Sequence, residues 1–368
     1  MSYLFPPSFA RPIRARFGLR RALLGLALAI TTVAFYVYAY LATSHLPSSP
    51  RLSNITEDNK RQLVDHSINN TLVIVPVNHG MLSKAENLLC SLRRTSFDTS
   101  KILFWALDPD ARNTLEEKGH VAYHDPSLFS VSRDTNLQGN TKAYKKMMLE
   151  RPKFFIDILS TGLDVLMLDA DTVFFQSPLL LRDPTVDAVF STDAREFYQT
   201  YDAFKDRDRR GSRIPPVCNG IFWMKASPKT VRLWQDMLDV FGAGWRTALW
   251  RLRAFLDDQR GMDVLLNDGR ARLVEPFPDG ITRDMVQGRY GDGKCELAVR
   301  LLDQTAVVNG HLLKNRKSTY EKSLQSLRRE GKDRIAAHLN WNTAEMTKEE
   351  GARQLGLWLL DEGGNCRV

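Results

Sequence analysis

Short apolar runs alternate along the chain with stretches in which apolar residues recur at helical spacing. Runs of roughly 4–8 apolar residues predict strands, and apolar residues at positions i, i+3 and i+4 predict helices. The predicted strands are residues 71–77, 101–107, 120–123, 164–171, 187–192, 220–225, 272–275, 306–309 and 335–340. The predicted helices are residues 82–92, 110–118, 142–159 (where Pro152 could break the helix), 228–241, 256–267 and 348–360. This alternation predicts an α/β fold, a sheet covered on both faces by helices.

The N-terminal region has a different pattern. Residues 22–42 contain no charged side chain, and about 20 apolar residues span a bilayer. Arginines are concentrated in the segment before this run, and tyrosines lie near its end. By the positive-inside rule, this arrangement predicts that the N-terminus lies in the cytosol. We therefore expect a cytosolic tail at 1–21, a transmembrane signal anchor at 22–42, a lumenal stem at 43–70 and one domain at 71–368. A cleavable signal peptide is the alternative, although its apolar region is usually about 7–15 residues long.

The net charge of +8 comes mostly from this N-terminal region. Five arginines and no acidic residue precede residue 51, so the remainder carries only +3. We therefore expect no nucleic-acid partner. Two N-glycosylation sequons, at Asn54 and Asn69, agree with a lumenal domain. Four cysteines lie beyond the anchor, where disulfides persist, and they allow three full pairings or four free thiols. Their spacing argues against a zinc site. The cysteines are Cys90, Cys218, Cys295 and Cys366.

A short apolar strand within residues 164–171 ends in two carboxylates, Asp169 and Asp171. Ligands of open α/β sheets bind outside the carboxyl ends of strands. Two carboxylates one residue apart can hold a hard divalent cation, which can bridge a diphosphate and stabilise a leaving phosphate. The alternative is a solvated acidic turn.

The whole segment LDVLMLDADTVFFQSPL, residues 163–179, resembles the signature of the nucleotide-diphospho-sugar transferases with a GT-A fold. It is most similar to the group with plant xylosyl-, galactosyl- and arabinosyltransferases of cell-wall polymers and extensins, like glycosyltransferase family 77. Over residues 70–360, further segments match family motifs in order. These are ENLLCS from Glu86 (Leu88 replacing the usual aromatic), Arg151 and Lys153, CNGIFWMKAS from Cys218 (with a spacer missing), Asp258-Gln259 with Asp263 near the usual Asn, His338-Leu-Asn340, Lys348, and Gly356-Leu-Trp358.

The resemblance implies a GT-A-type Rossmann-like mixed sheet, and it implies roles for single residues. Asp169 and Asp171 would bind Mn²⁺ or Mg²⁺ and thereby the donor diphosphate. His338 is a candidate third ligand or phosphate contact; its alternative is a hydrogen-bonded core histidine. Lys153, Arg151 and Lys348 would neutralise phosphate. Solvated helix faces are the alternative for all three, and the sequence favours that alternative for Arg151.

The same resemblance implies the remaining site. Asp258 and Gln259 would approach the sugar ring or the acceptor, one of them stabilising an oxocarbenium-like centre. Asn219 and Gly220 would let the backbone come close to the donor. Members of the group retain the anomeric configuration. We therefore expect a metal-dependent retaining transfer from a nucleotide sugar, UDP-linked by expectation, to a glycan or glycoprotein. The enzyme would be a single-pass type II protein of the Golgi membrane or the ER.

Two other classes stay open on sequence alone. A haloacid-dehalogenase-type phosphatase also places D-x-D-x-[TV] after an apolar strand, with Asp169 as nucleophile and Asp171 as acid/base. However, about 95 residues of α/β pattern precede this motif, and Asp257-Asp258 lies in a helical stretch. A catalytically inactive, membrane-tethered binding relative is the other class, because a fold can outlast its activity.

Overall fold

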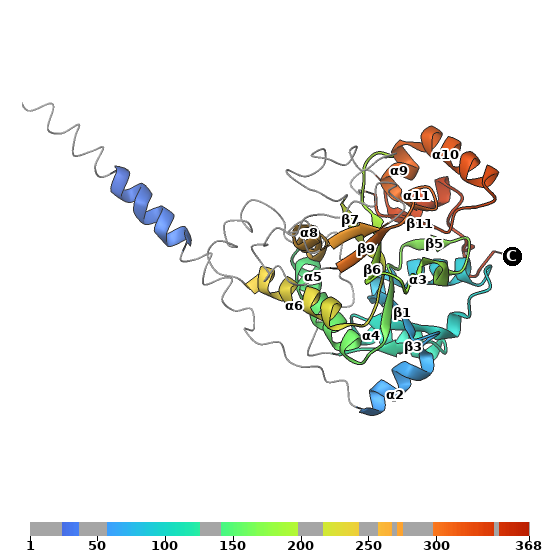
Figure 1. The fold of residues 1–368 in the computed structure, drawn as a ribbon, viewed down its shortest axis with the longest axis horizontal. Coiled ribbons are helices and arrows are strands. Elements are labelled where there is room, and N and C mark those ends of the chain that lie inside the picture. The colour runs from blue at the N-terminus through green and yellow to red at the C-terminus, as the bar shows by residue number, and fades with distance from the viewer. Residues whose placement is uncertain are drawn as a thin grey trace, which may run out of the picture. The chain divides into compact units, whose positions relative to one another are not determined.

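A mixed sheet of eight strands forms the centre of the described chain (Figure 1). The computed structural model describes residues 24–36, 57–125, 141–197, 216–242, 257–266, 271–274, 297–341 and 346–367. The strand order is β3-β2-β1-β4-β7-β6-β9-β8. The strands are β1 (Thr71–Val77), β2 (Ile102–Ala106), β3 (Val121–Tyr123), β4 (Asp164–Leu168), β6 (Ala188–Thr192), β7 (Val217–Met224), β8 (Ala271–Val274) and β9 (Leu297–Leu301).

Most neighbouring strands of this sheet are parallel, and β7 alone runs against both of its neighbours. Strands β1, β2, β4 and β6 therefore all end at the same edge. A second sheet has the order β10-β11-β5. Its strands are β5 (Thr172–Phe174), β10 (Val307–Asn309) and β11 (Ala336–His338). The expected α/β class with a mixed sheet is confirmed.

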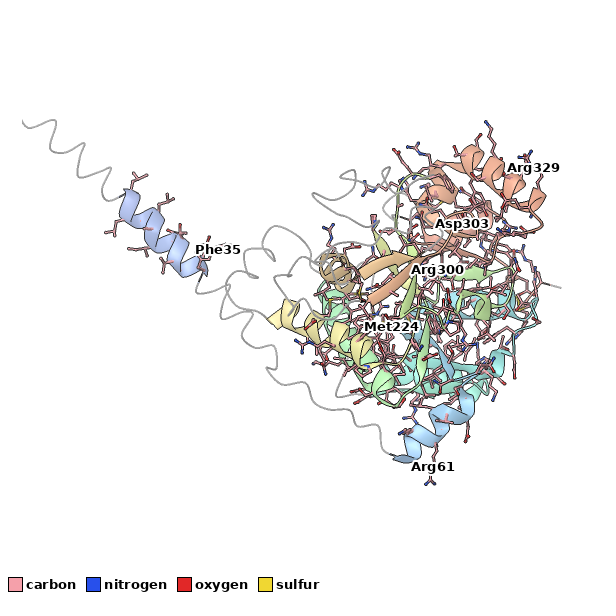
Figure 2. All side chains as sticks on the ribbon, in the orientation of Figure 1. Phe35, Arg61, Met224, Arg300, Asp303 and Arg329 are labelled. Carbon is pink, nitrogen blue, oxygen red and sulfur yellow. A yellow bond between two sulfur atoms is a disulfide. The ribbon has the colours of Figure 1, made fainter. Side chains whose placement is uncertain are left out.

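Helices cover both faces of the large sheet because successive side chains of a strand point to opposite faces. Leu72 and Ile74 of β1 pack in one apolar cluster with α5, α6 and α8, whereas Val73 and Val75 pack in another with α3. The helices are α3 (Leu82–Leu92), α4 (Pro109–Glu117), α5 (Thr141–Ser160), α6 (Pro228–Gly242) and α8 (Asp258–Leu265). Figure 2 shows the side chains that fill the space between these layers.

A third apolar cluster surrounds the small sheet, where the orange and red elements of Figure 1 gather. It contains Val173 of β5, Ala337 of β11 and Trp341. The surrounding helices are α9 (Gly310–Asn315), α10 (Lys317–Arg329) and α11 (Lys348–Gln354). Short 3-10 turns lie at His79–Met81, Thr99–Lys101 and Pro178–Leu181. The cluster attaches the C-terminal part of the chain to the edge where β4 ends.

Most predicted elements are observed within a few residues of the expected bounds, with three instructive differences. Helix α5 runs through Pro152 without a break. Helix α11 stops at Gln354, not at residue 360, because Gly356 has φ +68°, a left-handed conformation that ends a helix. The elements β5, β9, α9 and α10 were not predicted, and neither was α2; α10 buries only Tyr320 and Leu324, which is too sparse an apolar pattern to recognise.

The predicted stem contains a helix, α2 (Glu57–His66). Leu63 of this helix is buried in the cluster that also holds Leu72. The helix α2 therefore packs with the domain although it precedes the expected domain start at residue 71.

Residues 24–36, within the predicted anchor, form a helix. Among the described residues, no helix combines the length and the apolar character needed to cross a membrane. The predicted cytosolic tail (1–21), both ends of the predicted anchor (22–23 and 37–42) and stem residues 43–56 lie outside the described residues.

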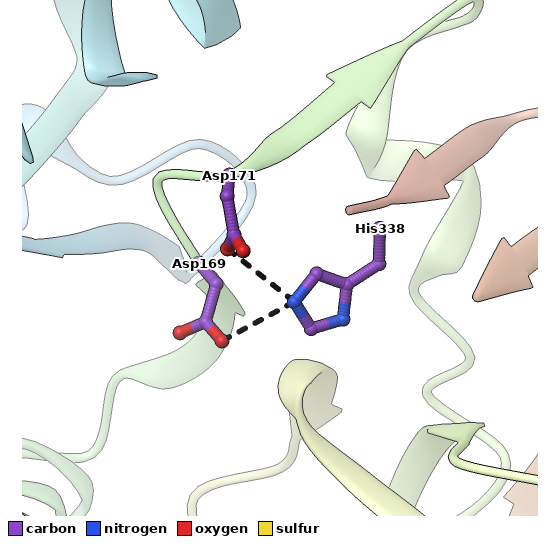
Figure 3. A group of neighbouring side chains, drawn as sticks. All are labelled: Asp169, Asp171 and His338. Atoms are coloured by element: carbon purple, nitrogen blue, oxygen red, sulfur yellow. Dashed lines mark ion pairs between the residues drawn. The ribbon is translucent and has the colours of Figure 1, made fainter. Parts of the chain in front are cut away.

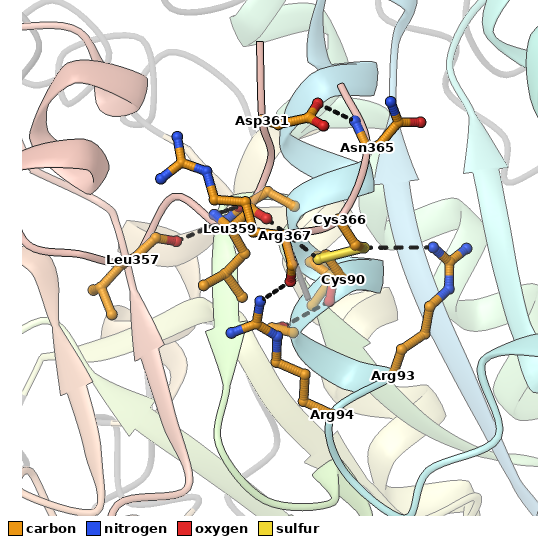
Figure 4. The surroundings of a disulfide bond; sticks show 12 residues. Cys90, Arg93, Arg94, Leu357, Leu359, Asp361, Asn365, Cys366 and Arg367 are labelled. Carbon is orange, nitrogen blue, oxygen red and sulfur yellow. Dashed lines mark hydrogen bonds between the residues drawn. A yellow bond between two sulfur atoms is a disulfide. The ribbon is translucent and has the colours of Figure 1, made fainter. Parts of the chain in front are cut away.

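One disulfide joins Cys90 on α3 to Cys366 near the C-terminus (Figure 4). Arg94 also donates a hydrogen bond to the carbonyl of Arg367, and Asn87 of α3 donates to the carbonyl of Leu357, so several contacts hold the C-terminal segment against α3. Cys218 is a buried free thiol, and Cys295 lies outside the described residues. Of the pairings left open by the sequence, the structure selects Cys90–Cys366.

We expect Cys366→Ser to lower the free energy of unfolding by about 2–4 kcal/mol, because the disulfide closes a very long loop in the unfolded chain. Denaturant unfolding with and without a reductant measures this effect. Reduction should destabilise the parent protein and leave the variant unchanged. A non-reducing peptide map that places Cys90 with any cysteine other than Cys366 would contradict the assignment.

Candidate active site

The two carboxylates of the Asp169-Ala170-Asp171 motif lie in the tight turn between β4 and β5. The backbone N–H of Asp169 donates to the carbonyl of Gly220 at 2.7 Å, continuing the antiparallel pairing of β4 with β7. The hydroxyl and the N–H of Thr172 both donate to the carbonyl of Asp169, at 2.8 and 3.2 Å. These bonds hold both aspartate side chains at the edge where the parallel strands end.

His338 reaches the carboxylates through the second sheet. It is the last residue of β11, which pairs antiparallel with β5 so that His338 lies opposite Thr172. The N–H of Leu339 donates to the carbonyl of Asp171 at 2.9 Å. The imidazole Nε2 lies 3.4 Å from an oxygen of Asp169 and 3.4 Å from an oxygen of Asp171 (Figure 3). The structure thus brings together all three predicted metal ligands.

The donor set fits a divalent cation. One ligand atom from each of the three residues lies within 4.8 Å of the others. Carboxylate oxygens suit Mg²⁺ and Mn²⁺, and the imidazole nitrogen favours Mn²⁺ over Mg²⁺, whose protein ligands are oxygens. The backbone also leaves room for this group, because a Cβ at Gly220 would lie 2.3 Å from His338 Cε1 and 2.4 Å from Asp169 Oδ2. Only glycine lets these two ligands approach β7 so closely.

We therefore expect Gly220→Ala to displace His338 and Asp169 and to weaken Mn²⁺ binding by about 10–100-fold, the effect typical of a disturbed metal environment. Titration of Mn²⁺ followed by electron paramagnetic resonance of the free ion measures the change. Gly119→Ala is a suitable comparison, since nothing lies within 4 Å of its Cβ position and its cost is the strain of φ +78° alone. Equal Mn²⁺ affinity in the Gly220 variant and the parent protein would contradict the packing argument.

Charges around the cluster keep the Asp171 carboxylate ionised. Burial alone would raise the pKa of Asp171, but Lys348 and His338 outweigh burial and lower this pKa strongly. Lys348 Nζ donates directly to Asp171. Burial also lowers the pKa of His338, yet Cys218 and Asp171 outweigh it and hold this pKa well above its usual value. Lys84 of α3 is a further charged neighbour of Asp171. Burial lowers the pKa of the Lys84 ammonium, and the negative charge of Asp171 opposes that shift.

A buried ion pair lies beside the metal cluster. Arg151 of α5 contacts Asp258 at 3.2 Å, and both side chains are less than 5% exposed. Arg151 also donates to the carbonyl of Asn219 at 2.8 Å, and the Asn219 amide donates to Asp258 at 3.3 Å. Burial raises the pKa of Asp258 to about 6, although Arg151 opposes the shift. Arg151 is therefore not on a solvated helix face, and the interpretation that the sequence favoured for this residue is wrong.

Gln259 belongs to a second polar group at the same edge. Its amide donates to Asp193 at 2.9 Å, and the amide of Asn340 donates to the other oxygen of Asp193 at 3.0 Å. Asp193 directly follows β6, which ends at the same edge of the sheet as β4. The side-chain oxygen of Asn340 in turn accepts from the N–H of Gly310 at 2.8 Å. Asp193 thus connects the helix that carries Gln259 with the loop after His338.

These groups line one cavity of about 400 Å³, a size typical of small-ligand sites. Eight predicted residues are in its lining: Asp169, Asp171, Asn219, Gly220, Asp258, Gln259, His338 and Lys348. Arg151 lines it as well. The side-chain oxygen of Asn219 is buried and, among the described residues, accepts no hydrogen bond. The cavity wall therefore combines a candidate metal cluster, a buried carboxylate and an asparagine whose buried side-chain oxygen has no donor among the described residues.

The structure does not place Lys153 with the other predicted residues. Lys153 is absent from the lining of this cavity, and its ammonium pairs with Glu150 at 2.7 Å on the same helix. Helical spacing explains the separation, because Arg151 and Lys153 are two positions apart on α5 and so face different directions.

Sequence reasoning gave no site role to several lining or neighbouring residues, among them Lys84, Asp193, Cys218 and Asn340. Asp193 could have been found by the argument that identified Asp169, since it also follows a buried strand. Lys84 has no comparable signal, because one lysine on an amphipathic helix is normally solvated.

Comparison with known proteins identifies the class. The family model for nucleotide-diphospho-sugar transferases matches residues 99–351, most of the chain. The chain belongs to this family. The match favours neither the haloacid-dehalogenase phosphatase nor a catalytically inactive, membrane-tethered binding relative.

The chain is also similar to two curated proteins whose names state a donor and an acceptor. The chain is 20% identical over 323 residues to the UDP-galactose:fucoside alpha-3-galactosyltransferase of Dictyostelium discoideum, covering 81% of this chain and 44% of that protein. It is 22% identical over 302 residues to the UDP-D-xylose:L-fucose alpha-1,3-D-xylosyltransferase 1 of Arabidopsis thaliana, covering 80% of this chain and 72% of that protein. Thus the chain spans less than half the length of the first relative. A solved structure of the galactosyltransferase LgtC is 13% identical and covers 80% of this chain and 96% of its own, with a TM-score of 0.43.

Proposed function

We propose that this protein is a metal-dependent glycosyltransferase that moves a sugar from a nucleotide-diphosphate sugar to a glycan or glycoprotein acceptor. The observation that carries the proposal is the cluster of Asp169, Asp171 and His338 in the wall of a cavity that also holds the buried carboxylate of Asp258. Membership of the nucleotide-diphospho-sugar transferase family supports the same function.

Each part of the cavity has a task in this proposal. Asp169, Asp171 and His338 hold Mn²⁺ or Mg²⁺, which supplies Lewis-acid stabilisation of the charge on a leaving diphosphate. Lys348, whose ammonium lies in the same wall, adds positive charge next to the phosphates. Asp258 and Gln259 face the sugar, and an ionised Asp258 stabilises positive charge that develops at its anomeric carbon. The side-chain oxygen of Asn219, which has no donor among the described residues, accepts a hydrogen bond from a sugar hydroxyl.

The names of the two relatives support a more specific proposal for the donor and the acceptor. Both use a UDP-sugar and both act on fucose. We therefore propose UDP-galactose or UDP-xylose as the donor and a terminal fucose as the acceptor. Both relatives form α-linkages, and an α-linked product from an α-linked UDP-sugar means that the anomeric configuration is retained.

The proposed location is the Golgi membrane or the ER, with the catalytic domain in the lumen and a single anchor at residues 22–42. The one-sided arginine cluster and the Cys90–Cys366 disulfide support this location, since disulfides persist in the secretory pathway.

A two-stage experiment tests the function. The full-length protein is first heated with UDP-galactose, UDP-xylose, UDP-glucose or GDP-mannose, with Mn²⁺ or with EDTA; a true donor raises the melting temperature only with the metal, because it binds the folded state. That donor is then incubated with fucosides and with matched sugars that lack fucose. Binding without transfer to any acceptor would favour the inactive relative, and no stabilisation by any nucleotide sugar would overturn the proposal.

A further inference from the structure

The thiol of Cys218 lies on the side of His338 that faces away from the carboxylates. Cys218 is on β7, with a residue exposure of 2%, and its sulfur lies 3.4 Å from His338 Nδ1. The opposite ring nitrogen, Nε2, contacts Asp169 and Asp171. Figure 3 shows these two nitrogens on different sides of the ring. The imidazole is therefore held between the carboxylate pair and one sulfur atom.

The direction of the hydrogen bond follows from the ligand role of His338. A nitrogen that binds a metal ion must offer its lone pair, so in neutral imidazole the proton sits on the other nitrogen. Nδ1–H then donates to the sulfur of Cys218. The amide of Asn340 also donates to this sulfur, at 3.9 Å. Both polar neighbours of the sulfur are thus donors, so the sulfur serves as their acceptor.

We propose that Cys218 is a positioning residue for the metal centre: its sulfur accepts the Nδ1–H of His338 and so fixes the ring orientation and the tautomer that presents Nε2 to the cation. Metal-bound histidines usually donate their second N–H to a carboxylate, a carbonyl or a water. Here a thiol takes that place. The inference rests on the proposed metal-dependent function and adds a residue to it.

Cys218 also connects the proposed metal centre with Gln259, which the proposed function places beside the sugar. Asn340 donates both to the sulfur of Cys218 and to Asp193, and Asp193 accepts from Gln259. A continuous chain of contacts thus runs from His338 through Cys218, Asn340 and Asp193 to Gln259. Loss of the sulfur is expected to disturb His338 first, because that contact is the shorter of its two.

The test compares Cys218→Ala, Cys218→Val and Cys218→Ser in the full-length protein. Mn²⁺ affinity is measured by electron paramagnetic resonance of the free ion, without donor or turnover. Alanine and valine cannot accept a hydrogen bond and should weaken Mn²⁺ binding by about 10–100-fold. Serine can accept one and should recover most of that loss. Val217→Ala is the matched control, because Val217 is the adjacent buried residue of β7 and packs in the apolar core; it should lower the melting temperature but leave Mn²⁺ affinity unchanged.

The outcomes separate the two proposals. Parent protein that binds no Mn²⁺ would overturn the metal-dependent function, and this inference with it. Parent protein that binds Mn²⁺ with the same affinity as the alanine or valine variant would overturn the role of Cys218 alone. Equal losses in the serine and alanine variants would overturn the hydrogen bond as the cause. If alanine prevents folding, the valine variant, which fills the volume of the thiol, gives the same comparison.

Discussion

Asp171→Asn is expected to lower sugar transfer by at least about 10²–10³-fold, the cost of losing one electrostatic contact to developing charge. Asparagine keeps the shape of the side chain but removes the negative charge that Lys348 and His338 surround. Mn²⁺ affinity should fall in parallel, since a neutral amide is a poorer ligand than a carboxylate. Rates with a saturating donor and a titration of Mn²⁺ measure the two effects.

Two further variants make this result specific. Asp169→Asn should have a similar effect, and because its side chain is 28% exposed it disturbs folding less. Asp187→Asn is the matched control, a carboxylate that also contacts a lysine, Lys229 at 3.5 Å, and is absent from the lining of the cavity. Transfer should be unchanged in this variant. Parent-like Mn²⁺ affinity and turnover in Asp171→Asn would refute the metal centre.

Asp258→Asn is expected to reduce turnover by about 10²-fold or more, because an amide cannot stabilise positive charge at the sugar as a carboxylate does. The loss should appear in the rate at saturating donor more than in donor affinity, since that charge exists only in the transition state. Steady-state kinetics with a fucoside acceptor measure both parameters.

The pH dependence of turnover and of stability tests the role of Asp258 independently. The pKa of Asp258 is raised to about 6, so the catalytically useful carboxylate forms as pH rises through 6, and parent turnover should rise with it. Stability should change in the opposite direction. Because the folded protein binds this proton more tightly than the unfolded chain, the free energy of unfolding should fall as pH rises from about 4 to about 6, by on the order of 2–3 kcal/mol, and level off above.

Asp258→Asn should remove both of these contributions between pH 4 and 6. Asp236→Asn is a matched control, since Asp236 is also fully buried and pairs with an arginine, Arg232 at 2.9 Å, on α6 and away from the cavity lining. Its turnover and its pH profile for turnover should match the parent. A control variant as impaired as Asp258→Asn would mean that loss of any buried carboxylate is damaging, and would remove the assigned role.

Local sequence was sufficient to predict the strand that precedes the carboxylate pair. The run from Asp164 to Leu168 is short and apolar, which is the pattern of a strand buried on both faces. Two aspartates after such a strand lie at its carboxyl end whatever the rest of the chain does. The metal hypothesis for Asp169 and Asp171 therefore required no tertiary information beyond the general rule for α/β sheets.

Local sequence was not sufficient for the partners of these carboxylates. His338 is 167 residues away from Asp171, and its role depends on the pairing of β11 with β5, which spacing along the chain cannot predict. The ligand assignment for His338 came from a family resemblance, as did the phosphate-neutralising role of Lys348. The same resemblance grouped Lys153 with Arg151, and the structure separates them because α5 turns them to different sides.

The contrast has a simple physical origin. Some features depend only on neighbours within a few residues: strand and helix preferences, helix ends at glycine, and the polar end of a buried strand. The local sequence therefore predicts the order of the α/β elements and the position of the motif Asp169-Ala170-Asp171. The close approach at Gly220, the disulfide between Cys90 and Cys366 and the contact of Cys218 with His338 join segments far apart in the chain. Such contacts form only when the register of the two sheets is set, and that register is a property of the packed core as a whole.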